Sequence, residues 1–388
     1  MKLYSRVCAE IDLDAIHDNM EQLRSSLGKD AHLVAVLKAD GYGHGAVPIA
    51  KMLEKETYVW GFAVAALEEG IILRKSGIKK PVLVLGCVFP DQYSDMIAYE
   101  IRATVYTEET ARELAEAAQK LGKQVYLHIK VDTGMGRIGF PVNTESVDII
   151  QRISGMESVC LEAMFTHFSK ADEEDKTYTL KQHEKFTWMK AQLEQRHVDI
   201  PYFDCDNSAG IIDFPDMKHD LARAGIAMYG LYPSKEVNRQ AVKLKPALTL
   251  VSHIIYVKEV EAGTSISYGG TFISKHKMRI ATIPVGYGDG YPRSLSNKGA
   301  VLIHGKRAKI LGRICMDQFM VDVTEIPEAA FMDTVVLIGK DGQEEITVEE
   351  LSDLSGRFPY EFICCLGKRI PRNYRAHGRI VEQVDSFM

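Results

Sequence analysis

The chain of 388 residues lacks a long apolar run. Its purest apolar stretch, Pro81–Pro90, is far shorter than the roughly 20 residues that a membrane-spanning helix requires. The first ten residues, MKLYSRVCAE, contain no apolar core, so we expect no signal peptide. Basic residues are not in excess either, because 47 Lys and Arg face 53 Asp and Glu. The resulting net charge of -6 argues against a nucleic-acid-binding protein.

Cysteine pairs of the kind that hold metals or form disulfides are also lacking. None of the seven cysteines belongs to a C-x-x-C motif, and the adjacent Cys364 and Cys365 suit neither an ordinary disulfide nor a tetrahedral metal site. We therefore expect reduced cysteines, a cytoplasmic protein and no metal. The apolar share of 46% and the charged share of 26% are typical of a soluble globular protein with a substantial core.

The first two-thirds of the chain alternates β-rich runs with helical ones. The eight candidate strands are His32–Leu37, Tyr58–Val64, Pro81–Leu85, Arg102–Val105, Gln124–Val131, Val159–Phe165, Tyr202–Asp204 and Leu221–Ala224. The clearest amphipathic segments between them are Ala46–Glu54, Ala66–Ser76, Glu108–Leu121 and Thr179–Gln195. Several strands are apolar throughout, as in parallel sheets covered on both faces. Eight strand–loop–helix units favour an α/β fold with a closed (β/α)8 barrel of the TIM type over an open sheet.

The residue pattern changes after about Tyr232, where β-branched runs replace the patterns of long helices. These runs are Ala247–Val260, Met278–Ile283, Ala300–Ile303, Ala308–Ile314, Phe319–Val323 and Thr334–Ile338. One helix is expected over Val348–Ser355. We predict a barrel over residues 1–243 and a mostly β domain over residues 244–388, with the first stretch of about 12 residues compatible with packing on the β domain.

The strongest local signal for chemistry is the segment Val34–Gly45, in which a buried-type strand ends at Lys38. Barrels place their active sites at the carboxyl ends of their strands. A lysine desolvated there becomes nucleophilic enough to form an imine with a carbonyl cofactor. The alternative is a surface lysine, the usual fate of a single lysine. Three glycines with Tyr42 and His44 directly after the strand favour a ligand-binding loop, because such a loop costs stability.

Eight segments together resemble the alanine racemases, pyridoxal-phosphate (PLP) enzymes that interconvert L- and D-alanine. They are Lys38–Gly45 (KADGYGHG), Lys130–Gly139 (KVDTGMGRIG), Phe165–Phe168 (FTHF), Asn207–Ala209 (NSA), Arg223–Ile226 (RAGI), Ile266–Gly270 (ISYGG), Pro284–Arg293 (PVGYGDGYPR) and Gly312–Gln318 (GRICMDQ). They occur in order over nearly the whole chain, which argues against chance similarity. The resemblance implies a barrel followed by a β domain, and an isomerase that supplies D-alanine for peptidoglycan in the cell wall.

The resemblance also implies the catalytic roles. Lys38 forms the internal aldimine with PLP and acts as one base, and Tyr268 matches the second base. An ordinary tyrosine has a pKa of about 10, so Tyr268 needs nearby positive charge to act as a base. Arg223 matches the arginine that faces the pyridine nitrogen, and His167 matches the histidine bonded to that arginine. Without the resemblance, Tyr268 reads as a turn tyrosine and His167 as a core histidine.

Further ligand contacts follow from the same matches. Tyr42, Ser208, Gly225 and Ile226 are expected beside the phosphate, and Arg137, Met316 and Tyr287 beside the substrate. Lys130 matches a lysine that some members carry as a carbamate; the alternative is an unmodified lysine paired to an acid. The related enzymes are head-to-tail homodimers, so each site is expected to combine Lys38 of one subunit with Tyr268 and Met316 of the other.

Alternatives remain at the level of sequence. A serine racemase or an amino-acid racemase of broad specificity would carry the same lysine and tyrosine. A non-catalytic PLP carrier would resemble only the first half of the chain, and decarboxylases of similar architecture need acidic and cysteine features that are not found here. One departure from the family is Lys368, where some members have a tyrosine before the terminal arginine-rich motif Arg369–Arg372. This departure leaves the tolerance for larger substrates open.

Overall fold

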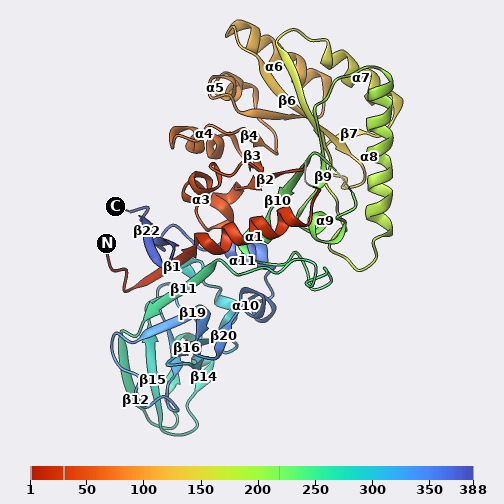
Figure 1. Cartoon of the computed structure of the whole chain (residues 1–388). Helices are drawn as coiled ribbons and strands as arrows, with labels where there is room; N and C mark the ends of the chain where they lie inside the picture. The colour runs from red at the N-terminus through yellow and green to blue at the C-terminus, as the bar shows by residue number, and fades with distance from the viewer. Residues whose placement is uncertain (1, 29–30, 218, 388) are drawn as a thin grey trace. The chain divides into compact units, whose positions relative to one another are not determined.

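The computed structural model describes residues 2–28, 31–217 and 219–387, which divide into two compact units. The barrel unit comprises residues 15–41 and 46–246, and the β unit comprises residues 2–14, 42–45 and 247–387 (Figure 1). Each unit is built from its own sheet, so each is described by itself. No helix within the described residues is long and apolar enough to cross a membrane.

The sheet of the barrel unit contains eight parallel strands in the described residues, which close into a barrel. They are β2 (His32–Val36), β3 (Val59–Val64), β4 (Val82–Val84), β5 (Arg102–Val105), β6 (Val125–Asp132), β8 (Val159–Phe165), β9 (Tyr202–Asp206) and β10 (Leu221–Ala224). Closure comes from two pairings, β10 with β2 and β5 with β6. The short β7 (Phe140–Pro141) adds to β6. The predicted closed α/β barrel is therefore confirmed, with strand ends displaced by at most two residues.

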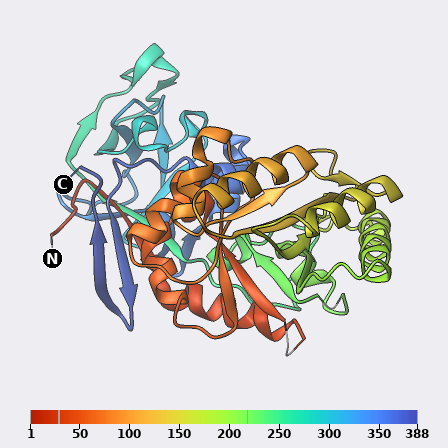
Figure 2. The same ribbon diagram turned by 90° about the horizontal axis from the view of Figure 1, so that it is seen from above.

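The helices of the barrel unit lie outside its strands, as Figures 1 and 2 show. They are α1 (Leu13–Ser25), α3 (Ala46–Leu53), α4 (Leu67–Lys75), α5 (Tyr93–Ala98), α6 (Glu108–Lys120), α7 (Thr144–Ser154), α8 (Thr177–Gln195) and α9 (Ser208–Asp213). Local capping fixes where several of them begin: the Thr107 hydroxyl accepts the N–H of Thr110 at the start of α6. Helix α6 then buries Ala111, Leu114 and Ala118 on one face, as its amphipathic pattern predicts.

The β unit is built on a long mixed sheet. The second part of the chain is therefore mostly β, as expected. Its strands are β1 (Val7–Asp12), β11 (Leu248–His253), β12 (Tyr256–Val260), β15 (Met278–Ile283), β16 (Ala300–Ile303), β17 (Lys306–Leu311), β18 (Phe319–Asp322), β19 (Thr334–Asp341), β20 (Glu344–Ile346), β21 (Arg372–Ala376) and β22 (Arg379–Val384). The separate hairpin β13 (Ser265–Ile266) and β14 (Phe272–Ile273) and the helices α10 (Val348–Ser355) and α11 (Pro359–Cys364) complete the unit. Strand β1 pairs with both β11 and β21.

One of the β-branched runs seen in the sequence is divided between two strands of the β unit. The run Ala247–Val260 forms two strands, β11 and β12, because the chain changes its hydrogen-bond partners between them. The N–H of Ile254 donates to Asp333 O, and that of Ile255 donates to Thr282 O. Strand β12 then pairs with β15, and its Val260 joins a small apolar cluster with Ile280 and neighbouring side chains. The helix Val348–Ser355 has the predicted bounds.

Candidate active site

Lys38 lies just beyond the carboxyl end of β2, where the chain makes a left-handed turn. Ala39, Asp40 and Gly41 have φ values of 53°, 52° and 61°. Two of these residues are not glycine, so the turn costs free energy that surrounding contacts must offset. The N–H of Gly41 donates to Leu37 O at 2.8 Å, and that of Ala46 donates to Asp40 Oδ1 at 2.8 Å. The half-buried Lys38 is thus carried by a strained loop, a feature that clusters at active sites.

The guanidinium of Arg223, on β10, is held inside the barrel by several acceptors. Its Nη2 donates to Thr166 O at 2.8 Å and to Cys205 O at 3.2 Å, and it lies 3.4 Å from His167 Nδ1. Its Nη1 forms an ion pair with Asp204 of β9. Both members of this pair are almost fully buried. Such a pair persists because removal of either partner would leave an uncompensated charge in the interior.

His167 follows β8 and is neutral near pH 7. Burial lowers its pKa well below the ordinary value, and the positive charges of Arg223, Lys130, Arg137 and Lys38 lower it further. A guanidinium can only donate, so His167 Nδ1 accepts from Arg223. The residues whose charges act on His167 come from four loops or strands at the carboxyl side of the barrel. The structure therefore brings together all five of these residues, each singled out from sequence.

Lys130, on β6, carries its ammonium group into the barrel interior. Its side chain is 3% exposed, and within the described residues Nζ has no hydrogen-bond partner. Nζ lies 4.7 Å from the centroid of the Phe165 ring. Burial, together with the positive charge of Arg223, lowers the pKa of Lys130 to about 7. A substantial fraction of this amine is consequently uncharged near neutral pH.

Two carboxyl groups of β9, those of Asp204 and Asp206, also lie buried in the barrel interior. Burial raises the pKa of Asp204 to about 6, although the facing Arg223 opposes this change. Burial also raises the pKa of Asp206 well above its usual range, and the neighbouring Asp204 adds to the effect. Burial therefore favours the protonated form of Asp206. The predicted strand Tyr202–Asp204 ends at Asp204, and neither aspartate was given a role from the sequence.

Ser208 begins helix α9 directly after β9, and it accepts hydrogen bonds from backbone N–H groups that follow β10. Its Oγ accepts the N–H of Gly225 at 3.0 Å and that of Ala227 at 3.3 Å. A hydroxyl has two acceptor sites and one donor, so the O–H of Ser208 is left to donate to a third group. The N–H of Gly225, a residue expected beside the phosphate, thus donates to Ser208 in this structure. The short helix that follows is η2 (Ile226–Tyr229).

The remaining candidate residues belong to the β unit. Tyr268 is 71% exposed, and Tyr287 and Met316 are also exposed. Backbone bonds bring the last two together: the N–H of Tyr287 donates to Cys315 O at 3.1 Å, and that of Gly288 to Met316 O at 2.8 Å. Gly286 is required beside them, because an added Cβ would lie 2.3 Å from Met316 O. Tyr287 and Met316 thus form one surface patch.

Tyr268 stands on a turn that is fixed by its neighbours. Ser267 has a φ of 64°, and its hydroxyl donates to Arg313 O at 2.5 Å. Gly269 follows with a φ of 70°, where an added Cβ would lie 3.0 Å from Arg313 Nη1. The turn therefore presents the exposed phenol of Tyr268 from a rigid base.

Tyr42 and Lys368, the other residues of the β unit named above, differ in burial. The ring of Tyr42 is buried, its centroid lies 6.1 Å from that of Tyr360, and burial raises the pKa of the phenol. Lys368 is exposed. The buried guanidinium of Arg372 donates to Gly43 O at 3.0 Å and to Ile370 O at 2.6 Å. The terminal motif thus anchors residues 42–45 in the β unit.

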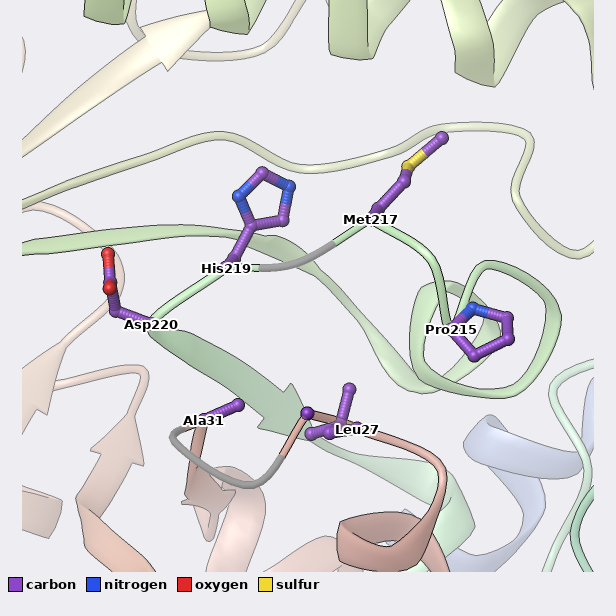
Figure 3. A pocket seen from close by; sticks show the side chains of 7 residues that line it. Leu27, Ala31, Pro215, Met217, His219 and Asp220 are labelled. Atoms are coloured by element: carbon purple, nitrogen blue, oxygen red, sulfur yellow. The ribbon is translucent and has the colours of Figure 1, made fainter.

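A cavity of about 170 Å³ in the barrel unit lies away from these groups (Figure 3). His219 and Asp220 precede β10, and Ala31 precedes β2, so this cavity is at the amino ends of the strands. Figure 3 shows Leu27 on the side opposite Met217. Barrel enzymes carry out their chemistry at the other end, where Lys38 and Arg223 lie.

Comparison with known families identifies the chain. Residues 11–233 match the family model described as the alanine racemase N-terminal domain, and residues 247–374 match that of the C-terminal domain. The chain belongs to the alanine racemase family. The resemblance stated from the eight motifs is therefore confirmed, as is the expectation that the chain is an isomerase.

Individual alanine racemases are similar over nearly their whole length. The enzyme of Halothermothrix orenii is 45% identical over 367 residues, 95% of this chain and 96% of its own. That of Clostridium tetani is 44% identical over 376 residues, 97% of each chain. The solved alanine racemase of Clostridium difficile 630 has a TM-score of 0.95 at 40% identity, and that of Bacillus anthracis with bound L-Ala-P has 0.92 at 35% identity. These two alignments cover all of this chain and 100% and 99% of the solved chains.

Proposed function

We propose that the chain racemises alanine with PLP bound to Lys38 and supplies D-alanine for peptidoglycan in the cytoplasm. The observation that carries this proposal is the cluster of Lys130, His167 and Arg223 beside Lys38, at the carboxyl ends of the barrel strands, in which Lys130 and Arg223 are buried. Membership of the alanine racemase family supports the substrate class.

The described residues fit PLP in two respects. Ser208 keeps a donor O–H after accepting two backbone N–H groups, which suits a phosphate oxygen. Arg223 is fixed in the interior by carbonyl and carboxylate acceptors, which suits it to face the ring nitrogen. Tyr42, Gly225 and Ile226 are proposed as further phosphate neighbours. When bound, PLP supplies the electron sink that stabilises negative charge at the substrate Cα.

Arg223 controls how that electron sink works. A guanidinium is a donor and is effectively never deprotonated, so Arg223 facing the pyridine nitrogen would leave that nitrogen without a proton. The electron sink would then be weaker, which would favour return of a proton to Cα over transamination. His167 acts through Arg223 as a positioning residue, since its neutral Nδ1 accepts from Nη2.

Racemisation requires a proton to leave one face of Cα and another to arrive on the opposite face. Lys38 is proposed as the base on one face, and Tyr268 of the partner subunit as the base on the other. The high exposure of Tyr268 supports this assignment, because a phenol that serves a neighbouring chain must be presented at the surface. In a head-to-tail homodimer, Tyr287 and Met316 would reach the substrate in the same way, while Arg137 would bind its carboxylate through a fork of donors.

Lys130 is proposed as a carbamylation site. Only the neutral amine attacks CO2; a C–N bond forms, one proton is released, and the lysine becomes an anion that can hold Arg137. The burial of Nζ and its lack of a hydrogen-bond partner within the described residues suit such a modification. The alternative is an unmodified lysine that stays close to the carboxylate of Asp204.

A labelled carbamate on Lys130 would distinguish these states. In ¹³C-bicarbonate, the parent is expected to show a carbamate signal by ¹³C NMR that is absent from Lys130→Ala. Because the pKa of Lys130 is lowered to about 7, protonation removes the reactive amine as the pH falls. The signal should decline as the pH is lowered through about 7. A parent spectrum without the signal at pH 8 would support the unmodified lysine.

The proposed reaction is tested by a chiral assay of the product. L-alanine is expected to give a mixture of equal amounts of L- and D-alanine, with solvent deuterium at Cα of both. L-serine and L-lysine are assayed beside it, because the exposed Lys368 leaves tolerance for larger side chains open. Faster turnover of L-serine than of L-alanine would favour the serine racemase alternative, and absence of D-alanine would reject the proposal.

A further inference from the structure

We propose that Glu69 is a positioning residue for Lys38, because its carboxylate holds the strained turn that follows the lysine. This inference rests on the proposed function of Lys38. Glu69 lies in the first turn of α4, the helix that follows the next strand of the barrel, β3. Glu69 is 30 positions from Ala39, the residue after Lys38, so no local motif joins the carboxylate to the turn.

Both oxygens of Glu69 are used, and they bind different loops. Oε1 accepts the N–H of Ala39 at 2.6 Å. Oε2 accepts the N–H groups of Ala65 at 2.7 Å and Ala66 at 3.2 Å. Ala66 is the N-cap residue of α4, so the contact with its N–H is the glutamate half of a capping box, and the alanine has no hydroxyl to supply the other half. The contact with Ala39 is additional, and it ties the loop after β2 to the loop after β3.

The contact with Ala39 falls where the backbone most needs support. Ala39 has a φ of 53° and Asp40 one of 52°, so two consecutive residues that are not glycine adopt the costly left-handed conformation. A charged acceptor forms a stronger hydrogen bond than a neutral one. Glu69 therefore stabilises the turn through the residue next to Lys38, and it fixes the direction in which the lysine leaves the strand.

Only a carboxylate can serve both loops. In a Glu69→Gln variant, the new amide would have one acceptor oxygen, and its NH2 group would face a backbone N–H. If the oxygen stayed on Ala65 and Ala66, the N–H of Ala39 would lose its acceptor. The variant thus keeps the size of the side chain and the helix cap while it removes the link to the turn.

The experiment measures two quantities separately in Glu69→Gln: the stability of the turn at Ala39 and the reactivity of Lys38. Amide hydrogen exchange at Ala39 is expected to be at least about tenfold faster than in the parent, the loss expected for one hydrogen bond to a charged group. Borohydride trapping followed by peptide mass spectrometry is expected to show slower attachment of PLP to Lys38, by a similar factor. The kcat for alanine should fall to the same extent with little change in KM. Glu68→Gln, whose exposed carboxylate accepts from Gln92 instead, is the matched control and should behave as the parent.

A second substitution separates positioning from general stability. A glycine at position 39 adopts a positive φ without strain. Adding Ala39→Gly to Glu69→Gln should therefore restore part of the rate at which PLP attaches to Lys38. A purely structural loss at the helix cap would not be restored. Should Glu69→Gln fold poorly, Glu69→Asp is used, because its shorter side chain cannot span both loops. The inference is overturned if attachment and Ala39 exchange match the parent, or if Ala39→Gly restores nothing.

Failure of the proposed function would look different. In that case the parent itself would not attach PLP to Lys38, whereas faster exchange at Ala39 in Glu69→Gln would still show that the carboxylate holds the turn.

Discussion

Replacement of Lys38 by alanine is expected to lower racemisation of alanine by at least about a thousandfold, since removal of a catalytic acid–base group alone costs about 10²–10⁴. The loss exceeds that of an ordinary base because the same amine holds the cofactor. Lys38 stands on the left-handed turn beyond β2, and within that turn no neighbouring side chain offers a second amine. A chiral assay of alanine measures the loss of racemisation, and the visible spectrum of the PLP-loaded protein measures the loss of cofactor attachment.

Lys51→Ala is the matched control, because Lys51 is an exposed lysine on the helix α3 that follows the same loop. It should keep the parent's rate and spectrum. A Lys38→Ala variant that retained covalently bound cofactor would place the attachment on another lysine and would contradict the assignment.

Replacement of Tyr268 by phenylalanine is expected to lower turnover by about 10²–10⁴ while the attachment of PLP to Lys38 is kept. The substitution removes one hydroxyl from a side chain that is 71% exposed, so the fold should be unaffected. Exchange of the α-proton of alanine with solvent deuterium should fall for one enantiomer far more than for the other. Tyr256→Phe, at another exposed tyrosine of the β unit, is the control.

Mixing the two inactive variants tests whether the site is shared. If Tyr268 serves the partner subunit, each hybrid of a Lys38→Ala chain with a Tyr268→Phe chain regains up to one good site in two. Activity should then return on mixing and reassembly. Absence of any recovery, with hybrid dimers shown by native mass spectrometry, would place both residues in a site made by one chain.

Most of the barrel could be predicted because its signals are local. Continuous apolar runs mark the buried strands, and three of the eight, Arg102–Val105, Val159–Phe165 and Leu221–Ala224, have the predicted bounds. Gly122, just after Glu108–Lys120, marks the end of that helix, as a C-terminal glycine does. The charged strands Arg372–Ala376 and Arg379–Val384 were not predicted, because their many polar residues hide the apolar pattern that marks a strand.

In the site, too, residues within local sequence motifs could be predicted, whereas residues whose partners lie far away in the chain could not. Lys38, Ser208 and Arg223 could be placed from motifs that follow strands. Asp204 and Glu69 could not be recognised, because their significance lies in partners from other elements of the barrel. The aspartates of the strand Tyr202–Asp206 were the available signal for Asp204, since a charge in a buried strand needs a partner.

The left-handed turn beyond β2 bears on attempts to move this chemistry to another protein. A designer who transplants KADGYGHG alone would carry over the lysine and its glycines, yet leave behind the acceptor supplied by the following strand–helix unit. A transplant that keeps this hydrogen bond therefore needs at least two adjacent barrel units, residues 32–75, and the host scaffold must accommodate both.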